Sequence, residues 1–269
     1  GTVGVLIIAM TVMSWRQALA ARRAGRTEEA RGAMSPWWPT FTLIWVCMQG
    51  ALGAWTVTWK LFPAIGTLHL LGGTGLLALL AIPASAMSLK QAGQWPALIG
   101  KGLRAALWVC LVLLVVQVSL GGWVSTNYAV LACSTFPTCQ GSWWPAMDFA
   151  QALQIWRPLG LLADGSHISV EALTAIHYTH RLMAYVVILA LAGLWMAMRH
   201  APALAKQRRL LGFFAVLQVL TGLSNVVLDW PLVAAVLHTG GAAALVTIVV
   251  WSLTATRSAG SPTTTQRPA

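Results

Sequence analysis

Four of the six histidines lie inside long apolar runs of the sequence: His69, His177, His180 and His238. Ionisable groups in membrane-spanning segments are rare, and they mark functional sites by default. Two imidazoles that face each other from different helices are the means by which a helical bundle holds haem iron. We therefore expect His180 and His238, which lie in different runs at similar depth, to bind haem iron.

His69 occupies nearly the same position in its apolar run as His238 does in its own, so it is a third candidate ligand. A bare copper or zinc ion is a weaker hypothesis, because such sites usually gather three or more ligands that include carboxylate or thiolate. The only matching acid on a histidine-bearing run is Glu171. The other two histidines fall in or beside loops and are expected to be solvated: His167 and His200.

Pairs of glycines follow two of these histidines: Gly72 and Gly73 lie three and four residues after His69, and Gly240 and Gly241 lie two and three residues after His238. A glycine three or four residues after the histidine shares its helix face, one turn away. The missing side chains either leave room for a flat ring or let two helices pack closely. Both interpretations remain open from the sequence.

Two further polar residues accompany His180. Arg181 could pair with a haem propionate, or its side chain could extend to lipid headgroups. His177 precedes His180 by about one turn, so it is either a second polar group in the pocket or a histidine bonded to a neighbouring helix.

Cys133 and Cys139 lie six residues apart in a long segment between two apolar runs. Thiols on the periplasmic side tend to be oxidised, and a turn at Pro137 would bring the two sulfurs together. We predict a disulfide, either structural or redox-active. Haem attachment through Cys-x-x-Cys-His is excluded, because neither that spacing nor that histidine is present. The other cysteines are expected to be buried apolar residues: Cys47 and Cys110.

The elements that must position these residues are membrane-spanning helices. The chain has 269 residues, of which 58% are hydrophobic and 9% charged, with a mean hydropathy of +0.72. A soluble domain carries about 25% charged residues. The apolar runs are continuous, which favours helices over barrel strands. We predict an all-α polytopic transmembrane bundle with helices near 1–15, 37–57, 63–87, 105–124, 169–198, 210–228 and 231–253. The first is too short to span alone, so we expect a fragment that begins within a helix.

The net charge of +11 follows the topology of the chain. Most basic residues fall in alternate connections and in the tail, on one side of the predicted bundle, and this side is cytoplasmic by the positive-inside rule. We therefore predict a multi-pass protein of the bacterial inner (plasma) membrane, surrounded by lipid, with a periplasmic Cys133 loop and a cytoplasmic C-terminus. The same distribution argues against binding to nucleic acid.

An internal repeat relates the two ends of the chain. Gln49 and His69 are separated by 20 residues, as are Gln218 and His238, and the second pair follows the first by 169 residues. We predict two pseudo-symmetric four-helix halves, of which about seven helices are present. Residues 1–88 would form the remainder of the N-terminal half, 89–104 a cytoplasmic linker, 105–256 the C-terminal half with an outer loop at 125–168, and 257–269 a disordered tail.

Several motifs together resemble the bacterial branch of the haem A synthase family. They are the segment from Leu120 to Pro145 that contains both loop cysteines, the sequence Ile-His-Tyr-Thr-His-Arg at 176–181, the sequences Leu-His-x-x-Gly-Gly at His69 and Leu-His-x-Gly-Gly at His238, and Gly53 to Thr58. The similarity extends to about Thr256, and the cysteine loop joined to a His-Arg helix is a fairly specific combination.

The resemblance implies an eight-helix enzyme that oxidises the C8 methyl group of haem O to a formyl group, which makes haem A for cytochrome oxidase. It implies that His180 and His238 are the axial ligands of haem b, and that His69 contacts the substrate haem. It also implies that Cys133 and Cys139 form the family's disulfide pair, and that haem O synthase is a partner.

The resemblance also places another histidine and an acidic residue upstream of Gly1, so the catalytic residues stay unassigned in this sequence. His177 stands where the C-terminal half would have the equivalent of that acid, and acid chemistry is not transferred to it.

Two other functions are compatible with paired histidines in a repeated bundle. A non-enzymatic haem b cytochrome linked to quinol would also need them, but such proteins usually hold two complete pairs in one bundle. A transporter would also suit repeats and glycines, but transporters commonly break helices at the midplane, whereas these histidines lie near one surface. The electron donor, quinol or another molecule, is unassigned.

Overall fold

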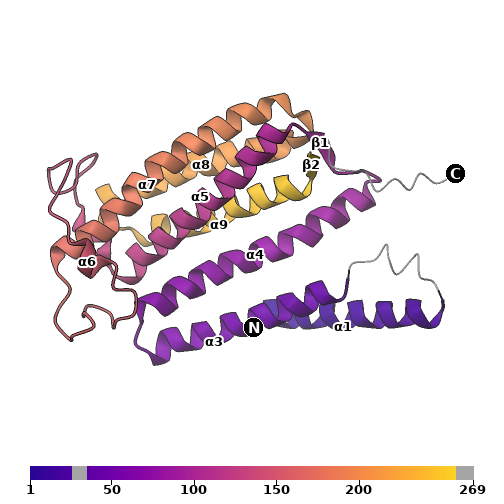
Figure 1. The fold of residues 1–269 in the computed structure, drawn as a ribbon, viewed down its shortest axis with the longest axis horizontal. Coiled ribbons are helices and arrows are strands. Elements are labelled where there is room, and N and C mark those ends of the chain that lie inside the picture. Colours follow the sequence, from indigo (N-terminus) through magenta and orange to yellow (C-terminus); the bar gives the residue numbers. More distant parts are fainter. Residues whose placement is uncertain (26–34, 259–269) are drawn as a thin grey trace.

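The computed structural model of the protein describes residues 1–25 and 35–258. Within that part of the chain, seven helices are long and apolar enough to cross a membrane. They are α1 (Thr2–Arg23), α3 (Trp37–Thr58), α4 (Pro63–Gln91), α5 (Lys101–Thr126), α7 (Val170–Ala197), α8 (Ala205–Val227) and α9 (Leu232–Thr254) (Figure 1). The prediction of an all-α, multi-pass membrane protein is confirmed.

The helix boundaries follow local sequence signals. Ser169 begins α7 because its side chain accepts a hydrogen bond from the amide of Ala172, and Pro63 occupies the first turn of α4, where its missing amide hydrogen costs nothing. The prediction that the first helix ends near Trp15 was wrong. The apolar run marks the edge of the hydrocarbon layer, whereas α1 continues to Arg23 and ends before Gly25, whose φ is +69°.

Helices α5, α7, α8 and α9 form a four-helix ring, in which each helix packs against two others. Helix α4 packs against both α5 and α9, α3 packs against α4, and α1 packs against α3 (Figure 1). The site histidines at positions 180 and 238 therefore come from opposite members of one ring, while His69 comes from the helix that lies against the ring.

Two hairpins of the chain share one backbone feature. The hairpin between α3 and α4 contains Lys60 and Leu61 at φ of 50° and 61°, and the hairpin between α8 and α9 contains Asp229 and Trp230 at 51° and 61°. The two pairs are 169 residues apart, as in the sequence. Such left-handed conformations are uncommon for residues other than glycine, so their recurrence shows one hairpin geometry used twice.

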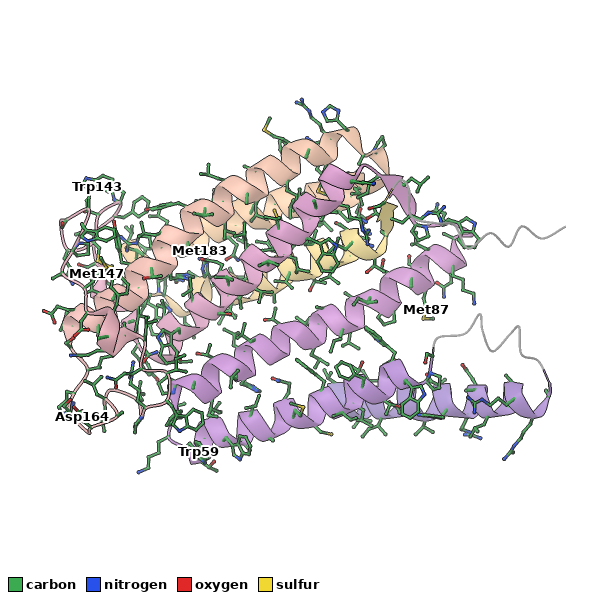
Figure 2. The ribbon with its side chains drawn as sticks, in the orientation of Figure 1. Trp59, Met87, Trp143, Met147, Asp164 and Met183 are labelled. Carbon is green, nitrogen blue, oxygen red and sulfur yellow. A yellow bond between two sulfur atoms is a disulfide. The ribbon has the colours of Figure 1, made fainter. Side chains whose placement is uncertain are left out.

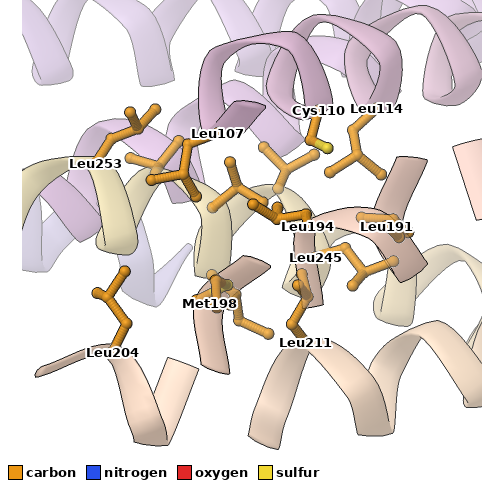
Figure 3. Close-up of a cluster of buried hydrophobic side chains, with 14 of the residues drawn as sticks. Leu107, Cys110, Leu114, Leu191, Leu194, Met198, Leu204, Leu211, Leu245 and Leu253 are labelled. Atoms are coloured by element: carbon orange, nitrogen blue, oxygen red, sulfur yellow. The ribbon is translucent and has the colours of Figure 1, made fainter. Parts of the chain in front are cut away.

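A closely packed apolar core fills one end of the ring. It includes Leu107 of α5, Leu194 of α7, Met198 directly after α7 and Leu211 of α8, which are almost completely buried (Figure 3). The opposite end carries the long loop between α5 and α7, where Trp143 and Asp164 lie far from Met87 (Figure 2). We call these the core end and the loop end.

Two three-residue strands close the core end. β1 (Ala97–Ile99) pairs in parallel with β2 (Thr256–Ser258), and the guanidinium of Arg104 donates to the carbonyl oxygens of Leu253 and Thr256 at 3.2 and 2.7 Å. The expectation of disorder from residue 257 is wrong for 257 and 258, because strand pairing with a distant segment leaves no local pattern. The rest of that tail, 259–269, lies outside the described residues.

The loop between α5 and α7 includes η1 (Ala129–Ala132), the short helix α6 (Phe149–Ala152) and a disulfide between Cys133 and Cys139, whose Cα atoms are 4.7 Å apart. The predicted disulfide is confirmed. Of the two remaining cysteines, Cys110 is buried as expected, but Cys47 is exposed, because its side of α3 faces no other described helix.

Candidate functional site

A cavity of about 510 Å³ lies at the loop end of the four-helix ring, and both His180 and His238 line it. Its floor is made by Leu114, Leu191 and Leu245, which also belong to the packed core. The volume is within the range of sites for small molecules and cofactors, and the lining is mostly apolar. The structure thus brings together the two histidines that the sequence predicted as a pair.

His238 on α9 is held by three residues of α8. Thr221 Oγ1 lies 3.0 Å from the ring Nδ1, and Gln218 Nε2 donates to the backbone carbonyl of His238 at 2.8 Å. A Cβ on Gly222 would lie 3.1 Å from the ring Cε1, so only glycine lets the imidazole approach α8 this closely. Both the ring and its backbone are therefore fixed against α8.

His180 on α7 is held by α5 in a similar way. Gln117 Nε2 donates to the backbone carbonyl of His180 at 3.2 Å, and a Cβ on Gly121 would lie 2.9 Å from the ring Cε1. The ring Nδ1 of His180 is buried and has no hydrogen-bond partner among the described residues. A neutral imidazole in an apolar cavity can offer its unprotonated nitrogen to a metal.

The same arrangement occurs a third time, at His69. A Cβ on Gly53 of α3 would lie 3.1 Å from the ring Cε1 of His69. His69 is exposed and does not line the cavity, so the structure does not bring it together with the other two histidines. The three units share one sequence signal, a glutamine followed four residues later by a glycine: Gln49 and Gly53, Gln117 and Gly121, Gln218 and Gly222.

Two of the glycines that follow the histidines make room for a neighbouring helix and not for a cofactor. A Cβ on Gly72 would clash with the side-chain amide of Gln49, and one on Gly241 would clash with that of Gln218. Close helix packing is therefore the correct interpretation for this pair. Gly73 and Gly240 have no such neighbour within 4 Å, and the glycines that line the cavity lie elsewhere: Gly66, Gly121, Gly122 and Gly222.

Arg181 and His177 connect the cavity to the disulfide loop. The buried guanidinium of Arg181 donates to the carbonyl oxygens of Thr135, Thr138 and Cys133 at 2.8, 2.8 and 3.1 Å. Nδ1 of His177 lies 3.0 Å from the carbonyl oxygen of Ala129, and His177 and Arg181 both line the cavity. His177 is therefore both a polar group of the cavity and a histidine bonded to a neighbouring segment. As predicted, His167 and His200 are exposed.

A second buried arginine fastens the same loop to α5. Arg157 is 1% exposed, and its Nη2 donates to Asn127 Oδ1 at 2.6 Å, while its guanidinium lies 5.6 Å from the centre of the Trp123 ring. Burial lowers the pKa of this guanidinium. The segment between α5 and α7 is thus fixed by two buried arginines where it covers this end of the ring.

The residues present fit a haem better than a bare metal ion. Three buried polar atoms of cavity-lining residues lack hydrogen-bond partners in the described part of the chain: His180 Nδ1, Gln117 Oε1 and Asn225 Oδ1. Within 1–25 and 35–258, no group of three or more His, Cys, Asp and Glu side chains could hold a metal ion. Two histidines on opposite helices with an apolar cavity suit a large planar ligand with a central metal.

Sequence reasoning did not single out Gln117, Thr221 and Asn225 as site residues, and Gln218 entered only as a marker of the repeat. The recurring glutamine and glycine spacing was a usable signal for the two amides. The contacts of Thr221 and Asn225 depend on how α8 is rotated against its neighbours, which the sequence does not state.

Comparison with known proteins places this site in a family. A family described as Cytochrome oxidase assembly protein matches residues 1–250. A protein named Heme A synthase from Shewanella oneidensis is 35% identical over 218 residues, which cover 79% of this chain and 64% of that relative. Another of that name from Shouchella clausii is 26% identical over 158 residues, covering 58% of this chain and 48% of the relative.

The matched regions thus span about two thirds and about half of these two relatives' lengths. The family match, by contrast, includes every spanning helix apart from the last residues of α9, and all the site residues described above. The chain belongs to the cytochrome oxidase assembly protein family.

Proposed function

We propose that the protein acts as a haem A synthase, which oxidises the C8 methyl group of haem O to a formyl group. The observation that carries the proposal is the pair His180 and His238, placed on opposite helices of one ring around an apolar cavity of about 510 Å³. The names of the relatives supply the reaction, and the membrane bundle is the setting that an apolar substrate requires.

In this proposal His180 and His238 would hold haem b in the C-terminal half. Haem b, when bound, supplies one-electron chemistry to the oxidation. The chain's own residues hold the two imidazoles at fixed positions through Gln117 and Gln218, and the disulfide loop excludes water from the loop end. Arg181 is proposed to face a propionate as well as the loop carbonyls, because its guanidinium lines the same cavity.

His69 is proposed to contact the substrate haem O, because it repeats the glycine contact of His238 in the other half of the bundle. No catalytic acid or second ligand is assigned to that site. The two-half division at 89–104 and haem O synthase as a partner belong to the same proposal, which leaves the electron donor, quinol or another molecule, unassigned. So does the orientation, with the Cys133 loop periplasmic and the C-terminus cytoplasmic, which rests on the basic residues at the core end.

The test is to purify the complete protein, as its gene encodes it, and to identify the extracted pigments beside those of His180→Ala and His238→Ala. We expect haem b in the parent, its loss from both variants, and haem A formation only in cells that carry the parent gene. Haem b retained at parental level in both variants would reject the ligand assignment.

A His167→Ala variant serves as the matched control, because that histidine is exposed and lies away from the cavity. It should keep both the pigment and the activity. Quinol-reducible haem b without any haem A formation would instead support the non-enzymatic cytochrome.

A further inference from the structure

The hydroxyl of Thr221 determines which ring nitrogen of His238 is free. The hydroxyl has one proton, and its shortest contact, at 2.7 Å, is the carbonyl oxygen of Leu217 one turn earlier on α8. That proton is therefore donated within the helix. Toward His238 Nδ1, 3.0 Å away, the same oxygen can only accept, so Nδ1 carries the hydrogen.

The consequence is a defined tautomer at a proposed ligand. With the hydrogen on Nδ1, the lone pair of a neutral imidazole resides on Nε2, and the side-chain hydrogen bonds of His238 to the described residues involve Nδ1 and the backbone carbonyl but not this nitrogen. A hydrogen bond of this kind behind a metal-binding histidine fixes the ring and raises its basicity. Thr221 is 5% exposed, so water does not compete for the contact.

The contact between Thr221 and His238 is not part of what the two repeated hairpins have in common. The displacement of 169 pairs Gln218 with Gln49, Gly222 with Gly53 and His238 with His69, but it pairs Thr221 with Leu52. A leucine side chain cannot accept a hydrogen bond. The glycine contact thus occurs at both His69 and His238, whereas the hydrogen bond that fixes the ring nitrogen occurs at His238 and not at His69.

We propose that Thr221 is a positioning residue that makes the His238 site a permanent haem site, and that Leu52 leaves the His69 site free to exchange its haem. This inference rests on the proposed function, since it takes His238 and His69 as ligands. An enzyme that converts one haem into another must release its product from one site while it retains its cofactor in the other. The difference between Thr221 and Leu52 would supply this distinction between a retained and a released haem.

The test compares Thr221→Val, which keeps the side-chain shape, with Thr221→Ser, which keeps the hydroxyl, in the haem-loaded complete protein. Haem b loss is followed by transfer to excess apomyoglobin, and the reduction potential of the retained haem is measured. We expect Thr221→Val to bind haem b about 10- to 100-fold more weakly, as is typical for such outer contacts, and to show a more positive potential. Thr221→Ser should match the parent in both measurements.

A second arm places the hydroxyl in the other half with Leu52→Thr. We expect slower transfer of the haem bound at His69 and no change in the potential of haem b. The inference is overturned if Thr221→Val matches Thr221→Ser in both readouts, or if Leu52→Thr leaves the transfer rate unchanged. His238→Ala separates this from the proposed function, because only a wrong ligand assignment would let that variant keep haem b.

Discussion

Nη2 of Arg181 lies 3.1 Å from the carbonyl oxygen of Cys133, so the residue that follows one proposed axial ligand is bound directly to the disulfide loop. Nη1 of the same guanidinium binds two further loop carbonyls, those of Thr135 and Thr138. The position of α7 and the closure of the loop end are therefore coupled through one buried side chain.

Replacing Arg181 should release the loop. We expect Arg181→Ala to destabilise the loop by more than about 3 kcal/mol, because three carbonyls would lose their donor and a hydrogen bond to a charged group contributes about 1.5–3 kcal/mol. Hydrogen–deuterium exchange over residues 133–142 should rise accordingly. Arg181→Lys should be intermediate, since an ammonium group lacks the planar fork that spans several acceptors.

Arg199→Ala is the control for that experiment. Among the described residues its guanidinium donates to the exposed His200 beside it, just beyond the far end of α7, so exchange in the loop should not change. Parental exchange over 133–142 in Arg181→Ala would show that the loop is held by other contacts.

Removing the disulfide should weaken the loop end without unfolding the bundle. Closing so short a loop is worth about 2 kcal/mol in the chain-entropy description, which sets the expected loss for a variant with both Cys133 and Cys139 changed to alanine. Thermal unfolding in detergent measures it. Cys47→Ala is the matched control, because that thiol is exposed and unpaired by any disulfide. Equal stability of the two variants would contradict the prediction.

Adding one methyl group beside each proposed ligand should disturb the haem site. Gly222→Ala and Gly121→Ala place a Cβ 3.1 and 2.9 Å from the ring Cε1 of His238 and His180, and such overpacking typically costs about 1–3 kcal/mol. We expect a changed haem absorption spectrum and reduced haem content. Gly240→Ala lies two residues from His238 but meets nothing within 4 Å, so its spectrum should stay parental. The same loss in all three variants would mean that helix strain, and not the ring contact, is responsible.

At the core end, Arg104→Ala should free the end of α9. The guanidinium supplies donors to the carbonyls of Leu253 and Thr256, and its loss should cost about 1.5–3 kcal/mol. Exchange of the amides of residues 256–258 should increase while the haem content stays the same. Lys101→Ala, three residues earlier and exposed, provides the comparison. A variant that loses haem would show that the two ends of the ring are coupled.

Much of the fold could be predicted because the bilayer leaves few solutions. A segment that crosses it must satisfy its backbone hydrogen bonds internally, so each apolar run of sufficient length becomes a helix. For the same reason the error at α1 concerned only its end: hydropathy reports where the hydrocarbon stops, and the helix continues through Arg16 to Arg23. The repeat was also visible, because both hairpins need the same residues at the same spacing.

The sequence by itself determined the spanning helices, the two-fold repeat, the cysteine pair and the histidines that matter. The tertiary structure decided which of them meet: His180 and His238 share one cavity, while His69 lies outside it. It also decided that Gly222, and not Gly241, lies against the imidazole of His238, and that Thr221 binds its ring nitrogen. These contacts depend on the rotation of each helix about its own axis, and that rotation is set by side-chain packing between helices that are distant in the sequence.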